Sequence, residues 1–265
     1  MLSIDQLDQV IGQNNSSKLL MVINTIGCLG IMGILKELSP NYVTLSIQYG
    51  FVLLIDSQRF QYNLESQYDA LMLSLIGGLN AIGYFTIFGA LRKIDLLVIM
   101  LVYDFKYLIR HSIKLQNKMS SILFLFGFIL NLMSNDRILA IWALVFGQIC
   151  QTGSGIIEDH FKFNYSNLQL FKGVFIIMMS LFNFGFYSDK IENSILIYLV
   201  SFPVLISFTF LQWLKYKVSV VNEMVDTLII GLQLLVLLLY NQFQILPTIS
   251  CVFYLIGIIS ICIKK

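Results

Sequence analysis

The stretch IDLLVIMLVYDFKYLIRHSIK, at residues 94–114, is apolar for most of its length and carries a lysine, Lys106, near its centre. A protonated amine in hydrocarbon costs several kcal/mol unless it faces a partner or a water-filled cavity, so an intramembrane lysine predicts a functional site. Of the 265 residues of the chain, 57% are hydrophobic and 12% are charged, and the mean hydropathy is +0.80. Because a soluble globule would need more polar surface, the sequence predicts a protein dissolved in lipid.

Apolar runs that resemble spanning helices recur along the chain. A spanning helix needs roughly 17 to 25 mostly apolar residues. Ten runs are recognised, of which the second is short for a span, at residues 18–38, 42–56, 70–91, 95–111, 119–135, 138–157, 167–187, 193–214, 218–240 and 244–263. Most connections are only a few residues long, which predicts antiparallel neighbours and leaves no room for an extramembrane domain.

Basic residues predict the orientation of the chain, because cytoplasmic loops carry an excess of Lys and Arg. With the N-terminus in the cytoplasm, eleven basic residues fall on that side and five on the other, apart from Lys106. We therefore expect both termini in the cytoplasm, with residues 1–17 as a cytoplasmic tail. That tail contains no Lys or Arg and so lacks the basic region of a signal peptide. The net charge of +2 indicates no nucleic-acid partner.

Few residues suit catalysis or metal binding. The four cysteines lie in apolar segments without CxxC spacing, which predicts free thiols and no cofactor. An intramembrane enzyme would need paired carboxylates, a histidine cluster or a positioned nucleophile, and the chain has two histidines, so we expect no enzyme. The run Glu158-Asp159-His160 resembles a metal or acid/base site, but it lies where a predicted helix meets a turn. We interpret it as a solvated helix cap.

The arrangement of five plus five helices suggests a duplication. Transporters are often built from inverted repeats, and an odd number of helices turns one half upside down. The polar turn MSNDR, at residues 133–137, would separate a first repeat at 18–136 from a second at 137–265. The sequence thus predicts an all-α integral membrane protein with ten transmembrane helices as two inverted five-helix repeats, although identity between the halves is not visible by eye.

Helical geometry groups the polar residues of the fourth and ninth helices. At about 100° per residue, Tyr103, Lys106 and Arg110 share one stripe. Asn222 and Asp226 share a comparable stripe on the ninth helix. Asp226 is therefore the predicted protein counter-ion of Lys106.

Residues 89–132 resemble nucleotide-sugar transporters of the drug/metabolite transporter superfamily. Asp95 occupies the position of an aspartate that opens helix four, the segment YDFK at 103–106 that of a YQLK motif, and Gly127 that of a glycine in helix five. The segment TGSGIIEDHFK at 152–162 resembles SSGFAGVYFEK at the end of helix six, and Lys172 stands for the arginine of a WxRNxQL motif.

Two motifs of that family are altered in this chain. A glutamine–asparagine pair of helix three is reduced to Asn80, out of register, and KGFATS of helix nine is replaced by NEMVDT at residues 222–227. The resemblance covers the pattern of all ten helices, but only about 45 residues in motif.

The resemblance implies an antiporter that exchanges a nucleotide sugar for a nucleoside monophosphate at a Golgi or endoplasmic reticulum membrane. Its partners would be these ligands, the lipid bilayer and, in a homodimer, a second copy of the chain. Lys106 would bind a phosphate, Tyr103 would stack on a base or bond a ribose, and Arg110 would attract the anion at the cytoplasmic mouth. The other residues of the expected substrate site are Asn80, Lys172, Asn222 and Asp226.

Alternative interpretations remain open at this stage. Arg110 and Lys172 lie close enough to the predicted membrane–water interface for their side chains to extend into it, which would give them a structural role and no role in ligand binding. An exporter of a small metabolite or amino acid with the same ten-helix fold is a second function, and a non-transporting polytopic membrane protein is a third.

Overall fold

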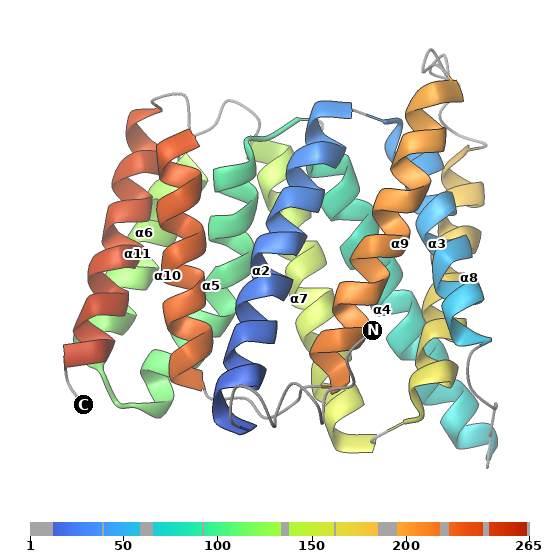
Figure 1. Ribbon diagram of the computed structural model, residues 1–265, viewed down its shortest axis with the longest axis horizontal. Coiled ribbons are helices and arrows are strands. Elements are labelled where there is room, and N and C mark those ends of the chain that lie inside the picture. The colour runs from blue at the N-terminus through green and yellow to red at the C-terminus, as the bar shows by residue number, and fades with distance from the viewer. Residues whose placement is uncertain are drawn as a thin grey trace. The chain divides into compact units, whose positions relative to one another are not determined.

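The computed structural model describes residues 13–38, 40–58, 66–91, 93–133, 138–161, 163–184, 195–217, 223–240 and 244–263. Within these ranges all regular structure is α-helical (Figure 1). The helices, in chain order, are α2 (Gln13–Leu38), α3 (Tyr42–Ser57), α4 (Gln67–Leu91), α5 (Leu96–Lys114), α6 (Lys118–Met133), α7 (Ile138–Phe161), α8 (Tyr165–Phe184), α9 (Ile195–Lys217), α10 (Glu223–Tyr240) and α11 (Ile245–Ile263).

The described helices follow the ten predicted apolar runs in order. The first differs at its start, because α2 begins at Gln13, inside the segment expected to be a tail. Within the described residues, four helical segments are long and apolar enough to cross a membrane: Gln67–Leu91, Ile138–Glu158, Tyr165–Asn183 and Ile245–Ile263. Others are apolar but shorter, such as α3, whose 16 residues rise about 24 Å against a hydrocarbon core of about 30 Å. The expectation of ten full spans is therefore met only in part.

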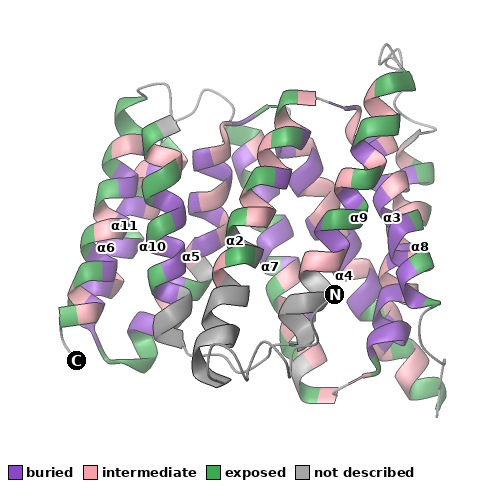
Figure 2. Cartoon of the chain, viewed as in Figure 1, coloured by how far each residue is buried: buried purple, intermediate pink, exposed green. Residues whose placement is uncertain are grey.

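Large apolar side chains are found both in the interior and on the surface of the described helices. Large apolar side chains lie on the surface of most described helices, and Leu139 is 86% exposed. Figure 2 shows these exposed positions alternating with buried ones along the helices. Small polar and amide side chains are buried as well, among them Ser46, Asn131, Gln148 and Ser250. Apolar surface of this extent is compatible with a protein that lies in lipid.

The chain divides into two compact units. One comprises Met1–Met32, Leu96–Asp136 and Phe210–Lys265, and the other comprises Gly33–Asp95 and Arg137–Thr209. We call them the first unit and the second unit. Each unit takes helices from both halves of the sequence, so neither unit coincides with residues 18–136 or 137–265.

In the first unit, α6 and α11 pack antiparallel through a reciprocal contact. Ser120 Oγ on α6 donates to the carbonyl oxygen of Gly257 on α11 at 3.0 Å, and Ser250 Oγ donates to the carbonyl oxygen of Gly127 at 2.6 Å. The two segments share one pattern, SSILFLFG at residues 120–127 and SCVFYLIG at 250–257. A Cβ at Gly127 would lie 2.8 Å from the ring of Tyr254, so this close approach requires glycine.

In the second unit, α3 and α8 form a second reciprocal contact. Both helices follow an asparagine whose side chain accepts a hydrogen bond from the backbone two residues on, Asn41 for α3 and Asn164 for α8. The sequences NYVTLSIQYG at 41–50 and NYSNLQLFKG at 164–173 share Asn, Tyr, Leu and Gly at equivalent positions. A Cβ at Gly50 would lie 3.0 Å from the carbonyl oxygen of Gly173, and one at Gly173 would lie 2.9 Å from that of Gly50.

Candidate functional site

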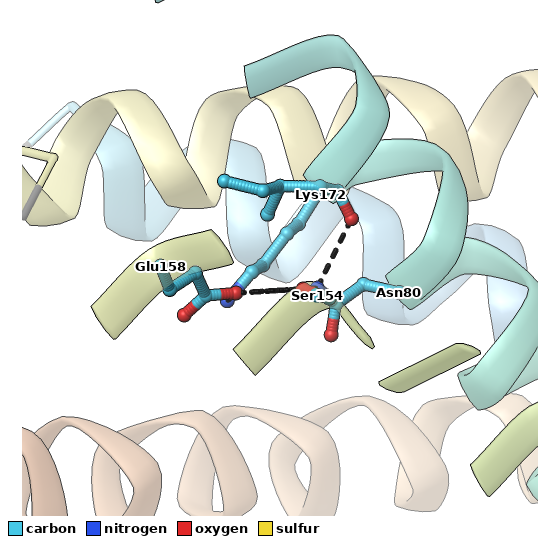
Figure 3. A network of polar contacts seen from close by, with 5 residues as sticks. Asn80, Ser154, Glu158 and Lys172 are labelled. Atoms are coloured by element: carbon cyan, nitrogen blue, oxygen red, sulfur yellow. Dashed lines mark hydrogen bonds and ion pairs between the residues drawn. The ribbon is translucent and has the colours of Figure 1, made fainter. Parts of the chain in front are cut away.

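A cluster of four polar side chains lies between α4, α7 and α8 of the second unit (Figure 3). Lys172 Nζ on α8 lies 2.8 Å from Glu158 Oε1 on α7. The same oxygen accepts hydrogen bonds from Ser154 Oγ at 2.9 Å and from Asn80 Nδ2 at 3.3 Å. Asn80 Nδ2 also donates to Ser154 Oγ and to the carbonyl oxygen of Ile76. We call Asn80, Ser154, Glu158 and Lys172 the polar cluster.

Local sequence explains why these side chains meet. Ser154 and Glu158 are four residues apart on α7, which places them on one face of the helix. A Cβ at Gly77 on α4 would lie 2.8 Å from the carbonyl oxygen of Phe171 on α8, so the two backbones are close just before Asn80 and Lys172. Small residues on α4 and α7 therefore bring three helices near enough for short polar side chains to touch.

The electrostatics of the polar cluster are those of a partly buried, neutral ion pair. The side chains of Lys172 and Glu158 are 15% and 25% exposed. Taking two charges out of water is costly, and the cost is recovered only when hydrogen bonds satisfy the remaining polar atoms. Here the hydroxyl of Ser154 and the amide of Asn80 supply such bonds to the carboxylate. Charge-assisted bonds of this kind are the strong ones in proteins.

The structure brings together two of the residues expected in the substrate site, Asn80 and Lys172. It corrects the interpretation of Glu158 as part of a solvated cap, because Glu158 points between the helices, where three donors bind it. His160 is exposed, as a residue in such a cap would be. The available signal for Glu158 was the serine four residues before it within an apolar helix, since that spacing gives a carboxylate a partner on its own face.

The remaining expected residues belong to the first unit. Tyr103 is half-buried on α5, and its ring centroid lies 6.0 Å from that of Tyr107. Lys106 and Arg110 are helical positions of α5, and Asp226 is one of α10, but their side chains lie outside the described part of the structure. Asn222 lies outside the described residues altogether. The proposed pairing of Lys106 with Asp226 therefore remains a prediction.

The helices that carry Lys106 and Asp226 do contact each other. Asp104 on α5 is buried and accepts a hydrogen bond from Gln233 Nε2 on α10 at 3.5 Å. The buried carboxylate of Asp104 on α5 therefore has a partner on α10.

Two further polar contacts lie near the helix ends of the second unit. Lys36 Nζ, at the end of α2, lies 2.9 Å from the carbonyl oxygen of Ile94 and 3.3 Å from Asp95 Oδ1. Asp95, the position matched to the family's helix-four aspartate, thus forms an ion pair that is partly exposed. Tyr165 Oη, at the start of α8, donates to Asp56 Oδ2 at 2.9 Å, and both residues are buried.

The described residues contain no group of three or more His, Cys, Asp or Glu that could hold a metal ion. None of the four cysteines, all of them in described helices, forms a disulfide. No protein-family model and no curated protein matches the chain.

Proposed function

We propose that the chain is a membrane carrier that exchanges a nucleotide sugar for a nucleoside monophosphate by alternating access. The observation that carries this proposal is the polar cluster, an ion pair with two neutral polar partners within a bundle of apolar helices. Polar and ionisable groups within membrane-spanning helices are energetically costly, and they commonly mark substrate or ion pathways.

The reciprocal contacts support two inverted five-helix repeats. The second and seventh helices, α3 and α8, share one sequence pattern and pack against each other, and so do the fifth and tenth, α6 and α11. Each pair is antiparallel. Helices at equivalent places in two oppositely oriented repeats are expected to pack in this way around a twofold axis.

The anionic substrate is supported by the two lysines in apolar segments and by the resemblance to nucleotide-sugar transporters. Lys172 would bind a phosphate with help from Ser154 and Asn80 in the second unit, and Lys106 is the expected anion-binding residue of the first unit. A phosphate accepts hydrogen bonds from ammonium, hydroxyl and amide groups alike. Such a carrier would reside in a Golgi or endoplasmic reticulum membrane, which is where the resemblance places this function.

One observation favours a second candidate. Because Lys172 is paired with Glu158, the polar cluster as a whole is neutral. A small zwitterion such as an amino acid would match it, with its carboxylate at Lys172 and its ammonium at Glu158. An exporter of such a metabolite would use the same fold.

Uptake into vesicles tests the proposal and separates the two candidates. Purified protein is reconstituted in vesicles that are empty or preloaded with UMP, GMP, CMP or AMP. We expect labelled UDP-, GDP- or CMP-linked sugar to enter preloaded vesicles faster, because crossing with an empty site leaves charged groups poorly compensated. Protein-free vesicles are the control. Equal uptake into empty and preloaded vesicles would contradict obligatory exchange, and uptake of amino acids without any nucleotide sugar would favour the second candidate.

A further inference from the structure

We infer that Glu158 is an internal competitor for the anion site of the carrier: its carboxylate occupies the donors of Lys172, Ser154 and Asn80, and a phosphate of the ligand must displace it. This inference rests on the proposed function. It assigns Glu158 a role opposite to that of a ligand-binding residue, since Glu158 would weaken ligand binding while it keeps the unliganded cluster neutral.

Three donors converge on one oxygen atom of Glu158. An ammonium from α8, a hydroxyl from α7 and an amide from α4 all lie within 3.3 Å of Glu158 Oε1. This is the donor set that a phosphate oxygen prefers. A site that already binds one oxyanion through three donors, two of them buried, can bind another oxyanion once the first has left.

Two of the three donors are held in place, whereas the carboxylate of Glu158 can leave. Asn80 is buried and is also bonded to the backbone of Ile76 within its own helix at 3.1 Å, and Ser154 is buried. Glu158 has the longer side chain, lies near the end of α7 and is 25% exposed. Rotation of its side chain would move the carboxylate toward water without moving the backbone of any of the three helices.

Glu158 also supplies the negative charge that compensates Lys172. Lys172 without a counter-ion would be an uncompensated cation among apolar helices, and removal of one partner from such a pair is costly. Glu158 avoids that cost when the ligand is absent. Because the ligand has to displace Glu158 from Lys172, its binding free energy is reduced by the free energy of the Lys172–Glu158 pair.

The prediction is therefore that Glu158→Gln binds nucleoside monophosphates more tightly than the natural chain. Glutamine keeps the shape and an acceptor oxygen for Ser154 and Asn80, but it has no charge to compete for Lys172. We expect Kd to fall about tenfold, which corresponds to about 1.4 kcal/mol. Glu37→Gln, at an exposed glutamate of α2, is the matched control and should leave Kd unchanged.

Binding is measured on purified full-length protein by calorimetry and by thermal shift with UMP, GMP, CMP and AMP. Lys172→Gln should bind nucleoside monophosphates more weakly. Adding Glu158→Gln to Lys172→Gln should not restore affinity, because the ammonium for which Glu158 competes is already absent. This double-mutant cycle separates competition for Lys172 from a general change in charge. Should Glu158→Gln fail to fold, Glu158→Asp tests the same point, since its shorter side chain withdraws the carboxylate from Lys172.

The possible results distinguish a failure of the competition by Glu158 from a failure of the proposed nucleotide-sugar exchange. If the natural chain binds a nucleoside monophosphate and Glu158→Gln binds it equally or more weakly, the inference is wrong and the carrier proposal stands. Weaker binding of amino acids by Glu158→Gln would show that Glu158 holds the ammonium of a zwitterion, which also overturns the inference. If neither protein nor any variant binds a nucleotide, both the inference and the nucleotide-sugar proposal fail.

Discussion

Two lysines of this chain, Lys106 and Lys172, occur in apolar segments. Lys172 is paired with Glu158 at 2.8 Å, so removing its charge would leave a carboxylate without its cation. Substitutions of Lys172 therefore combine effects on binding and on stability, and they need the double-mutant cycle described above. Lys106 lies in the middle of the apolar stretch at residues 94–114, and its substitution is the second test of an anion-binding lysine.

We predict that Lys106→Ala abolishes nucleotide-sugar exchange without unfolding the protein. A phosphate would lose its partner, whereas the relief of a costly amine in hydrocarbon offsets the cost of leaving the predicted counter-ion Asp226 without a cation. Lys106→Arg should restore little activity, because a planar guanidinium does not replace a compact ammonium in a fitted site.

Exchange in vesicles and thermal melting of the purified variants measure the two effects separately. Lys114→Ala, at an exposed lysine of the same helix, is the matched control and should behave like the natural chain. Normal transport by both Lys106 variants would remove Lys106 from the site.

Sequence reasoning found part of the polar cluster and missed the rest. Lys172 and Asn80 could be named from the resemblance to a family, which supplies positions but no contacts. The sequence predicts a solvated cap at Glu158, because this residue lies beside Asp159 and His160 near the end of a helix. A linear sequence does not show which face of a helix end points toward the neighbouring helices. The contact depends on the close approach of α4 and α8 at Gly77, which is a tertiary property.

Among the elements, glycine positions control which helices meet. In lipid, apolar side chains gain little by leaving their surroundings for another helix, so close packing at small residues selects the partner. Gly50 and Gly173 illustrate this, because each faces a backbone carbonyl of the other helix that has no room to move.

We predict that Gly173→Ala destabilises the protein by about 2 kcal/mol, the usual size of an overpacking effect. The added Cβ would lie 2.9 Å from the carbonyl oxygen of Gly50. Gly89→Ala on α4 is the matched control, since no atom lies within 4 Å of its added Cβ. Alanine has a higher helix propensity than glycine by about 1 kcal/mol, so this control should be neutral or stabilising.

Thermal or denaturant unfolding of the three proteins in detergent gives the comparison. A stabilising effect of Gly173→Ala, equal to that of Gly89→Ala, would show that the α3–α8 approach is looser than described.

Helix order and approximate bounds were predictable from hydropathy alone, since every described helix overlaps one apolar run. The partners of these helices were not predictable, because an apolar helix in lipid carries no strong period that points to its neighbour. The paired patterns at 41–50 and 164–173 could have been found in the sequence, but they become evident only when the contact shows which positions to compare.

For the whole molecule, the bias of basic residues predicts that both termini lie in the cytoplasm. Cysteines introduced at Lys190 and Lys265, positions outside the described residues, should be labelled by a membrane-impermeant reagent from opposite sides of sealed vesicles. The four natural cysteines are first replaced by serine or alanine, so that each signal has one source. Labelling of both positions from the same side would refute the topology.

The reciprocal contact between α6 and α11 has the form of an isologous dimer interface, in which a patch on one partner meets the same patch on the other. Ser120 binds Gly257 as Ser250 binds Gly127, although both helices belong to one chain. Such an interface carries its own specificity, and the polypeptide between the helices adds only a high effective concentration. A substitution at one serine thus alters one half of this self-complementary contact and leaves the other serine–carbonyl bond in place.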